Sequence, residues 1–476
     1  MTVIASGGAF GAVAPRAPRS NPFYENGDDH MRRFLCVVML CASFTGARAQ
    51  VLSTDDLALR VKADFAHAWR GYKTYAWGHD GLRPLSRKPY DWYGTPFYLT
   101  AVEALDTMTL MGMTDEADST REFIATHLSF DRDVYVNVFE FTIRVLGSLL
   151  ANYQMSADTR LLHLAEDLGR RMLPAFVTAT AMPYREVNLK TGAVRGEISN
   201  PAAAGTLLVE FGSLTAMTGK GEFYNSAKLA LLSIYRARSP IGLVGEAMNV
   251  TTGEWTKTDS HLSAGIDSYY EYCLKCADLF DDADCRQMWQ THYNAINRYL
   301  LDSTATGFWY GHADMNTGKR TKTWFGALDA YFPACLALYG DINRAGRLMQ
   351  SCLAMWEKHG IEPDQYNYVT GEVVNPRYYL NPEVMESAYY MFQRTGDPVY
   401  QEMGRIFLDS LETYCRTEEA FTELDNVVTK KQMDVMDPYF MAETMKYLYL
   451  LFAPSETLMF EKYIFNTEAH PIRKAW

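Results

Sequence analysis

The sequence predicts an all-α protein built as a ring of seven helical hairpins, an (α/α)7 barrel, with minor β-hairpins in its loops. Three observations lead to this prediction. Apolar residues recur at helical spacing through nearly the whole chain after residue 50, helix-breaking clusters recur at near-regular intervals, and strand-like alternation is sparse. With 476 residues, 48% of them hydrophobic and 21% charged, the chain can bury a large core.

The first 49 residues are expected to lie outside this fold, and residues 50–476 are expected to form a single domain. Residues 31–49 contain two arginines, an apolar run and then Ala47-Arg48-Ala49, an order typical of a signal peptide and its cleavage site. We therefore expect an exported protein, periplasmic, secreted or in the secretory pathway, whose mature chain begins at Gln50. The apolar run is too short for a stable membrane span, and no later stretch replaces it.

The protein is acidic, with 45 Lys and Arg against 57 Asp and Glu. Residues 1–49 hold five Arg and three acidic residues, so the remainder carries 40 basic and 54 acidic residues, a net charge of −14. A surface of this sign repels nucleic acid and anionic lipid. We therefore expect neither as a partner, and we expect a monomer.

Two of the eight cysteines, Cys36 and Cys41, belong to the predicted signal peptide. Cys273 and Cys276 form a CxxC in a helical stretch, with only Cys285 nearby. This setting offers too few ligands for a structural zinc site. We interpret these cysteines as buried thiols or as partners in a disulfide that crosses a hairpin.

Helical spacing is clearest in two segments. One face of a helix is marked by steps of 4, 3, 4 and 3 through Phe139, Ile143, Leu146, Leu150 and Tyr153. The same pattern runs through Met441, Met445, Leu448 and Phe452. Strand-like alternation is best near residues 182–197 and 365–375, where short hairpins are expected in loops.

Breaker clusters divide the helical stretches at seven places, centred on residues 115, 157, 219, 282, 340, 396 and 455. The gaps between these centres are 42, 62, 63, 58, 56 and 59 residues, and one helical hairpin with its return loop fits each gap. Seven antiparallel helix pairs could stack as an open solenoid or close into a toroid. We favour closure because both chain ends stay helical or apolar, without a polar capping repeat.

Six carboxylates fall in phase with this repeat, 9 to 17 residues before their turns: Glu103, Glu140, Glu210, Asp267, Glu383 and Glu443. About twelve helical residues span roughly 18 Å, so each acid is expected near the far end of its helix. If the ring closes, the acids converge on one mouth of the barrel. On spacing alone, chance placement among the 54 acidic residues stays an alternative.

Two of these acids have neighbours that point to chemistry. Glu140 lies among apolar residues with Arg144 one helical turn onward, although this pair could be purely structural. Asp267 directly precedes the aromatic segment 268–272. Carboxylates beside aromatic rings suit the binding of sugars, whose hydroxyls bind acids and whose faces pack on rings.

The sequence also predicts where one acidic helix begins. Asn381 followed by Pro382 is typical of an N-cap and the first helical position. Glu383 and Glu386 would then lie in the first turn of that helix and share one of its faces.

Seven segments, in order along nearly the whole chain after residue 50, resemble glycoside hydrolase family 47, the class I α-mannosidases. They are ALDTMTLMGM (104–113), VFEFTIRVLGSLL (138–150), GTLLVEFGSLTAMTG (205–219), DSYYEYCLK (267–275), NPEVMESAYYMFQRTGD (381–397), MAETMKYLYLLF (441–452) and FNTEAHP (465–471). The resemblance implies a seven-hairpin α/α barrel, the fold that the turn spacing predicts independently. It also implies a calcium-dependent hydrolase that releases mannose from α-linked, above all α-1,2-linked, oligosaccharides with inversion.

Carried over residue by residue, the resemblance implies three catalytic carboxylates. Glu140 would be the general acid, acting through a water, Glu383 the general base, and Asp267 a third catalytic acid. Thr467 would bind Ca²⁺, which in turn would bind the 2- and 3-hydroxyls of the sugar. The other implied residues orient waters and hydroxyls, hold the acid or stack on the sugar: Glu210, Glu386, Glu443 and Glu468; Arg144; and Tyr439. Glu103 matches no catalytic position.

The chemistry of the implied site agrees with elementary electrostatics. Inverting hydrolysis needs one protonated and one ionised carboxyl, far enough apart to admit a water. Several clustered carboxylates cannot all stay ionised unaided, because each raises the pKa of its neighbours. A hard divalent cation with oxygen ligands, such as Ca²⁺, resolves this conflict.

The chain departs from the family pattern at several positions. Gly265, Ala327 and Asn381 replace larger or charged residues on the side of the cleft that holds the rest of the glycan. We therefore expect a different branch preference with the same reaction. The family's frequent disulfide is also absent, because Cys352 matches one half while Ala330 occupies the other.

Two alternative functions remain. A weakly active or non-hydrolytic mannose-glycan-binding protein of the same fold would be favoured by loss of a core acid, but all are present. A helical toroid that serves as an interaction scaffold, or acts on another polymer, is supported only by the predicted ring.

Overall fold

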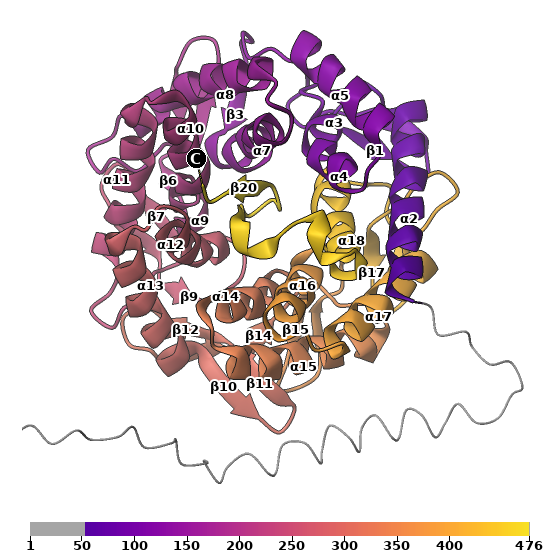
Figure 1. Ribbon diagram of the computed structural model, residues 1–476. Helices are drawn as coiled ribbons and strands as arrows, with labels where there is room; N and C mark the ends of the chain where they lie inside the picture. Colours follow the sequence, from indigo (N-terminus) through magenta and orange to yellow (C-terminus); the bar gives the residue numbers. More distant parts are fainter. Residues whose placement is uncertain (1–52, 476) are drawn as a thin grey trace, which may run out of the picture. The chain divides into compact units, whose positions relative to one another are not determined.

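In the computed structural model, residues 53–475 are described, and they form a ring of helices around a central hairpin (Figure 1). The inner helices are α4 (Leu105–Leu110), α7 (Gly147–Ser156), α10 (Leu208–Thr218), α12 (Asp267–Leu279), α14 (Phe332–Tyr339), α16 (Glu383–Thr395) and α18 (Met445–Phe452). The outer helices are α2 (Thr54–Tyr75), α5 (Thr114–His127), α8 (Thr159–Met172), α11 (Gly221–Ala237), α13 (Ala283–Ala295), α15 (Ile342–His359) and α17 (Val399–Tyr414). The predicted α/α barrel is confirmed. The predicted signal peptide lies outside the described residues.

Each of the first six inner helices packs against the outer helix that follows it in the chain. The seventh pair is formed differently, because α18 packs against α2, at the other end of the described chain. Figure 1 shows the two helices side by side, in yellow and indigo. The seventh turn, at residue 455, therefore does not join a helical hairpin as predicted. It leads instead into the strands β19 (Tyr463–Phe465) and β20 (Pro471–Arg473) in the middle of the ring.

Helix α2 closes the ring because its sequence carries both a start signal and an apolar stripe. Ser53 and Asp56 form a capping box, in which each side chain accepts a hydrogen bond from the other's backbone N–H. The buried stripe comprises Leu57, Val61, Phe65, Ala68 and Tyr72, whose spacing of 4, 4, 3 and 4 matches one helix face. This face packs on α18, so the first and last helices of the barrel share one core.

The short turns explain the breaker clusters. Helix α14 ends at Gly340, whose φ of +98° is a left-handed conformation that favours glycine, and α16 ends in the same way at Gly396. Asp341, which follows Gly340, accepts a hydrogen bond from Arg344 N–H at the start of α15. The clusters therefore stop an inner helix and begin an outer one within a few residues.

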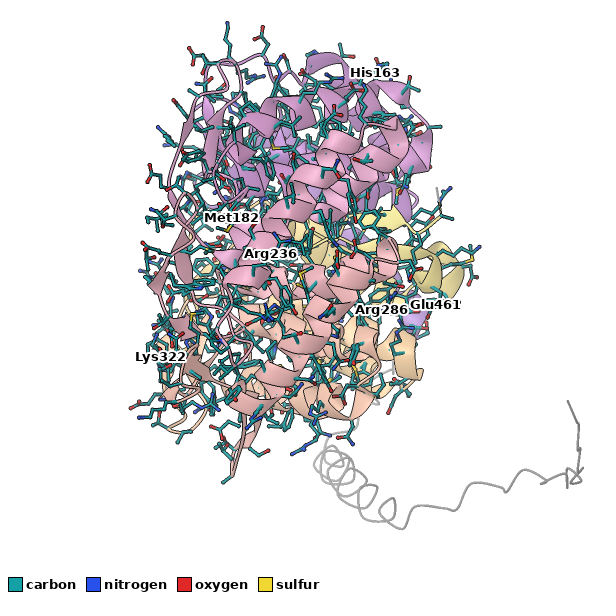
Figure 2. All side chains as sticks on the ribbon, turned by 90° about the vertical axis from the view of Figure 1, so that its left-hand side faces the viewer. His163, Met182, Arg236, Arg286, Lys322 and Glu461 are labelled. Atoms are coloured by element: carbon teal, nitrogen blue, oxygen red, sulfur yellow. The ribbon has the colours of Figure 1, made fainter. Side chains whose placement is uncertain are left out.

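The long return loops carry the strands on the opposite face of the ring. In the side view of Figure 2, Met182 and Lys322 from these loops lie on one side, and Arg286 and Glu461 lie on the other. The strands form small antiparallel sheets such as β3 (Tyr135–Asn137), β4 (Glu186–Asn188) and β5 (Val194–Arg195). Each three-stranded sheet joins loops from successive hairpins. The strands predicted within 182–197 and 365–375 are confirmed, the latter as β15 (Gln365–Asn367) and β16 (Val373–Asn375).

Both segments with clear helical spacing are helical, but neither is a regular α-helix throughout. A π-helical turn, η1 (Phe141–Leu146), separates α6 (Val138–Glu140) from α7, and a second, η5 (Phe440–Thr444), precedes α18. Apolar spacing does not distinguish a π-helical turn from an α-helical one. Such turns are frequent at functional sites, and both of these border the central cavity described below.

The six cysteines of the described chain are buried free thiols. Of the two predicted possibilities, the structure has the thiols and not the hairpin-crossing disulfide. Cys352 is among them, in line with the expected absence of the family's disulfide. Among the described residues, no helix combines the length and apolar character required to cross a bilayer.

Candidate active site

A cavity of about 400 Å³ opens among the inner helices, where the return loops meet them. Its lining is strongly acidic: Glu140, Asp267, Glu271, Asp364, Glu383, Glu386, Glu443 and Glu468 contribute carboxylates, while Arg144 and Arg185 contribute the positive charge. Of the site residues predicted from the sequence, all except Glu210 line this cavity. The predicted convergence of the acids at one mouth therefore holds for four of the six in-phase residues, while Glu103 and Glu210 do not line the cavity.

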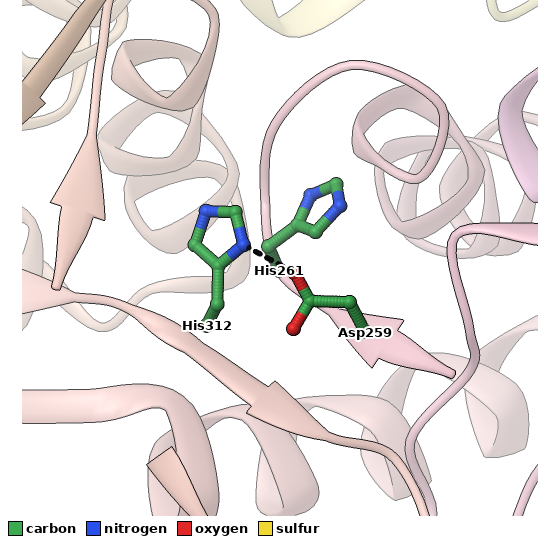
Figure 3. Close-up of side chains that lie close together, drawn as sticks. All are labelled: Asp259, His261 and His312. Carbon is green, nitrogen blue, oxygen red and sulfur yellow. Dashed lines mark hydrogen bonds and ion pairs between the residues drawn. The ribbon is translucent and has the colours of Figure 1, made fainter. Parts of the chain in front are cut away.

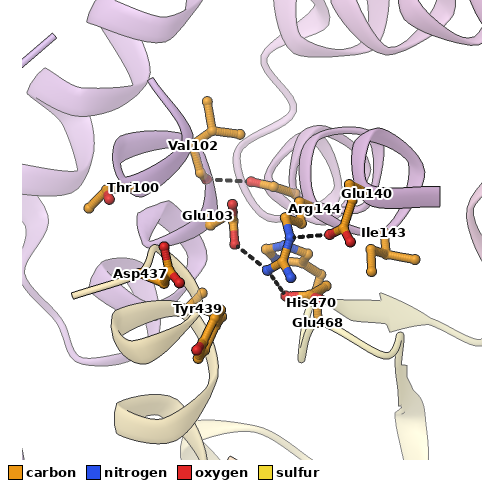
Figure 4. Close-up of polar contacts among 12 residues, drawn as sticks. Thr100, Val102, Glu103, Glu140, Ile143, Arg144, Asp437, Tyr439, Glu468 and His470 are labelled. Carbon is orange, nitrogen blue, oxygen red and sulfur yellow. Dashed lines mark hydrogen bonds and ion pairs between the residues drawn. The ribbon is translucent and has the colours of Figure 1, made fainter. Parts of the chain in front are cut away.

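Arg144 is the centre of a charge cluster in this wall (Figure 4). Its Nε donates to Glu140 Oε2 at 2.8 Å, and its Nη1 donates to Glu103 Oε2 at 3.2 Å and to Glu468 Oε2. Arg144 is only 9% exposed. Burial alone would lower the pKa of Arg144, but Glu468, Glu103 and Glu140 raise it well above its ordinary value. Arg144 thus stays charged and holds Glu140 at the cavity.

Glu103 is a residue that the sequence analysis left without a role. Its side chain is fully buried, Oε1 has no hydrogen-bond partner among the described residues, and Oε2 accepts from Arg144. Burial raises the pKa of Glu103 well above its usual range, although Arg144 acts in the opposite direction. We infer a neutral carboxylic acid behind Arg144. The only sequence signal for it was its phase with the turns.

Two neighbouring carboxyls, Glu443 and Glu468, also have raised pKa values. Burial raises the pKa of Glu443 well above its usual range, and charge repulsion and a hydrogen bond with Glu468 raise it further. Burial likewise raises the pKa of Glu468, which lies beside both Arg144 and Glu443. The two carboxyls therefore titrate as a pair, and burial disfavours ionisation of both at once.

Glu383 and Glu386 lie in the first turn of α16, as predicted, and both line the cavity. The predicted cap is wrong in detail, because Pro382 occupies the N-cap position and Asn381 Oδ1 accepts from Tyr379 N–H. Burial raises the pKa of Glu383 well above its usual range and that of Glu386 to about 7. Glu383 Oε2 is buried without a hydrogen-bond partner in the described chain, so this oxygen is available to a ligand in the cavity.

Asp267 is the first residue of α12 and lines the cavity from a third side. Its Oδ1 accepts from Ser268 N–H at 2.7 Å, and Tyr331 OH donates to its backbone oxygen. Burial raises the pKa of Asp267 to about 7, so the side chain can change protonation state near neutral pH.

Thr467 lies at the tip of the central hairpin and lines the cavity. Asn466 fixes this tip, because its Oδ1 accepts from the N–H groups of Glu468 and His470, while its Nδ2 donates to Glu210 Oε1 at 2.7 Å. Glu210 thus holds the hairpin in place through Asn466, and Glu210 itself does not line the cavity. Its predicted contact with waters and hydroxyls stays a prediction.

A cluster of three buried charged side chains holds the same hairpin in place. No pattern in the sequence indicated this cluster. Asp106 contacts His470 Nδ1 at 2.7 Å and Lys446 Nζ at 2.8 Å, and all three side chains are fully buried. Lys446 also donates to Ala469 O. These contacts join α4, η5–α18 and the hairpin, so they fix Thr467 relative to the acids.

The remaining predicted positions fall partly at the cavity. Tyr439 lines it, with its ring centroid 5.5 Å from the Arg144 guanidinium carbon, and its hydroxyl donates to Tyr379 O. Gly265 and Asn381 also line it, as expected. Ala327 does not, because it is fully buried, so this departure from the family pattern contacts no ligand directly.

The arrangement fits a hard divalent cation at the hairpin tip. Thr467 and the carboxylates of Glu383, Glu386, Glu443 and Glu468 line the same cavity and offer it oxygen donors. Without a cation these carboxylates have raised pKa values and Glu383 Oε2 has no partner. All-oxygen ligation with high negative charge suits Ca²⁺.

A further buried acid carries a testable consequence for stability. Glu362 is fully buried, neither of its carboxylate oxygens has a hydrogen-bond partner in the described chain, and burial raises its pKa to about 8. The folded chain therefore holds this proton more tightly than the unfolded chain. The stabilising contribution is complete below the ordinary value of 4.5 and is lost as the pH rises through about 8.

We expect Glu362→Gln to change stability little at pH 5 and to raise the free energy of unfolding at pH 9 by on the order of 3 kcal/mol, because the amide cannot ionise. Urea denaturation at both pH values measures the effect. Glu357→Gln, at an exposed position of α15, is the matched control and should be neutral. Equal stability of the wild type and Glu362→Gln at pH 9 would contradict a protonated Glu362.

An all-α barrel whose central cavity is lined by carboxylates, one of them held by a buried arginine, has the groups that binding or acid–base cleavage of a sugar requires. The comparisons agree with this class. The model of glycosyl hydrolase family 47 matches residues 64–474, and the chain belongs to this family.

Relatives and solved structures support the assignment. The chain is 35% identical over 480 residues to α-mannosidase I MNS5 of Arabidopsis thaliana, covering 93% of this chain and 82% of that protein. It is 38% identical over 451 residues to ER degradation-enhancing α-mannosidase-like protein 2 of Mus musculus, covering 87% and 77%. The structure of an α-1,2-mannosidase from Trichoderma reesei superposes with a TM-score of 0.81 at 25% identity, covering 88% of this chain and 98% of that one.

Proposed function

We propose that this protein is an exported, calcium-dependent glycosidase that releases mannose from α-linked glycans, chiefly α-1,2-linked, by a single displacement with inversion. The observation that carries the proposal is the cavity itself, where Glu140, Asp267 and Glu383 meet from three inner segments of the ring. A relative and a structural neighbour named as α-mannosidases support the substrate class. The name of another relative, which refers to the ER, supports passage through the secretory pathway.

In this proposal Glu140 and Glu383 act on opposite sides of the scissile bond. Arg144 holds the Glu140 carboxyl at the cavity, where Glu140 acts as the general acid and passes its proton to the leaving oxygen through a water. Glu383 accepts a proton from the attacking water, and Asp267 orients that water or a neighbouring hydroxyl. Tyr439 presents its ring to the sugar.

The residues proposed to hold calcium, directly or through waters, are Thr467, Glu383, Glu386, Glu443 and Glu468. When bound, calcium supplies positive charge that favours ionised carboxylates and coordinates sugar hydroxyls. Glu383 is then ionised, the state that a general base requires. Glu210, through Asn466, keeps the hairpin tip in place.

The test is hydrolysis of α-1,2-mannobiose by the protein, with and without EDTA. We expect mannose release that is abolished by chelation and restored by Ca²⁺ but not by Mg²⁺, because Mg²⁺ requires a smaller octahedral site. Glu383→Gln protein is the negative control. Full activity after exhaustive chelation and metal analysis would remove calcium from the proposal. Binding of mannobiose without hydrolysis would favour the alternative, a mannose-glycan-binding protein of the same fold.

The stereochemistry of the same reaction tests the mechanism. A single displacement on an α-linked substrate releases β-mannose first, whereas a double displacement through a covalent intermediate releases α-mannose. Proton NMR in the first minutes, before the anomers equilibrate, distinguishes the two. Initial accumulation of α-mannose would overturn the inverting mechanism and leave the family assignment intact.

A further inference from the structure

A second cluster of metal-binding side chains lies outside the cavity, where two return loops form a sheet (Figure 3). Strand β9 (Asp259–Ser260) pairs antiparallel with β12 (His312–Asp314), with Ala313 opposite Ser260. Residues 259 and 261 point to the same side because side chains alternate along a strand. Extending the register by one residue places His312 opposite His261, so all three side chains share one face.

The three side chains meet at short range. One ligand atom from each of Asp259, His261 and His312 lies within 4.8 Å of the others. The centroids of the two imidazole rings are 4.4 Å apart, and each histidine is only 4% exposed. Two protonated rings at this separation would repel each other. Neutral rings with free electron pairs are the form that coordinates a metal.

The hydrogen bonds leave coordination positions open. His312 Nδ1 contacts Asp259 Oδ2 at 2.9 Å, and His261 Nδ1 accepts from Ser263 N–H at 3.2 Å. Both of these contacts use Nδ1, so Nε2 of each ring is the nitrogen offered to a metal.

We propose that Asp259, His261 and His312 form a second metal site, selective for a zinc-like divalent ion and separate from the proposed calcium site. Two imidazoles and one carboxylate suit zinc, whereas calcium requires oxygen ligands. Around a zinc ion the ligand atoms would lie roughly 3.4 Å apart, so the three side chains need to close by about 1 Å. A water completes the coordination.

Two residues compete with the metal for Asp259. Thr321 Oγ1 donates to Asp259 Oδ1 at 2.5 Å. Lys322 Nζ lies 3.0 Å from Asp259 Oδ2, and its side chain is 37% exposed. Its ammonium also lies 4.7 Å from the centroid of the Trp324 ring. Because the side chain reaches solvent, it can leave Asp259 when a metal binds. Removing this positive charge should therefore strengthen metal binding.

The proposed metal site is close in sequence to residues that line the cavity. His261 is followed by Ala264, Gly265 and Asp267, which line the cavity. A metal that joins His261 to β12 therefore ties down the loop that leads to α12. Zinc binding does not depend on catalysis. The zinc site can therefore be absent while the proposed hydrolysis stands, and hydrolysis can be absent while zinc still binds.

The experiment is titration of metal-stripped protein with ZnCl2 in the presence of saturating CaCl2, followed by calorimetry and by thermal melting. We expect one zinc ion per chain at this site and a rise in melting temperature of about 3 °C at a hundredfold excess over Kd. Co²⁺ in place of Zn²⁺ should give the absorption bands of a low-coordinate site with nitrogen ligands.

Variants locate the binding. His261→Ala, His312→Ala and Asp259→Asn should each weaken zinc binding at least tenfold, while Lys322→Met should strengthen it several-fold. His163→Ala, at an exposed position of α8 (Figure 2), is the matched control and should bind as the wild type does. Circular dichroism checks that each variant is folded, and Lys322→Met tests the site without removing a ligand. No zinc binding by the wild type, or binding unchanged in the His261→Ala/His312→Ala double variant, would overturn the proposal.

Discussion

Glu383→Gln is expected to lower the turnover of α-1,2-mannobiose by at least about a thousandfold with little change in folding. The amide has nearly the same volume, but it cannot accept a proton from the attacking water, and general-base catalysis contributes on the order of 10² to 10⁴. Because the catalytic rate and not the fold is affected, kcat should fall while the thermal melting profile changes little. Initial rates with and without Ca²⁺ measure the effect.

The matched control is Glu103→Gln, which makes the same chemical change at a buried acid that does not line the cavity. Since Glu103 is inferred to be neutral in the folded chain, its amide should lower turnover far less than Glu383→Gln does. A wild-type rate in Glu383→Gln would remove it as the base. Equal losses in both variants would point to disruption of the charge cluster and not to a proton transfer.

Arg144→Met is expected to abolish measurable turnover and to lower the free energy of unfolding by about 3 to 5 kcal/mol. The substitution removes the cation that contacts Glu103, Glu140 and Glu468 and leaves the buried Glu468 carboxyl without its counter-charge. Urea denaturation and the mannobiose assay measure the two effects. Arg144→Lys keeps the charge but cannot donate to three carboxyls in the same geometry, so it should be intermediate.

A double variant separates charge from packing in this cluster. If repulsion among unpaired carboxylates causes the loss, Arg144→Met/Glu468→Gln should recover part of the stability that Arg144→Met loses. Purely additive losses would show that the methionine fails for steric reasons. Wild-type stability of Arg144→Met would contradict the central role of the guanidinium.

The candidate site was predictable where it depends on neighbours in sequence. The pair of Glu140 and Arg144 follows from i, i+4 spacing, and the structure confirms their contact. The partners Glu103 and Glu468 lie 41 and 324 residues from Arg144, so no local pattern indicates them. Glu210 shows the opposite case, since its phase with the turns is correct while Asn466 and Tyr272 separate it from the cavity.

The fold, like the site, was predictable where it depends on neighbours in sequence and not where it depends on distant residues. Hydrophobic spacing predicts that residues 137–153 are helical, yet it cannot reveal the π-helical turn that lies between Glu140 and α7. Breaker clusters predict where inner helices stop, because glycine and aspartate act on the adjacent backbone. The hairpin predicted at the last cluster, near residue 455, was wrong, because the helix that completes the seventh pair comes from the beginning of the described chain.

The sequence by itself determined which segments are helices, where they turn, and that acids recur in phase with those turns. These properties arise from backbone preferences and apolar periodicity that act within a few residues. Only the tertiary structure decided that α2 closes the ring against α18, which carboxyls meet Arg144, and which of them hold protons. Ion pairing and pKa depend on burial and on charges brought together from distant parts of the chain, and folding alone sets both.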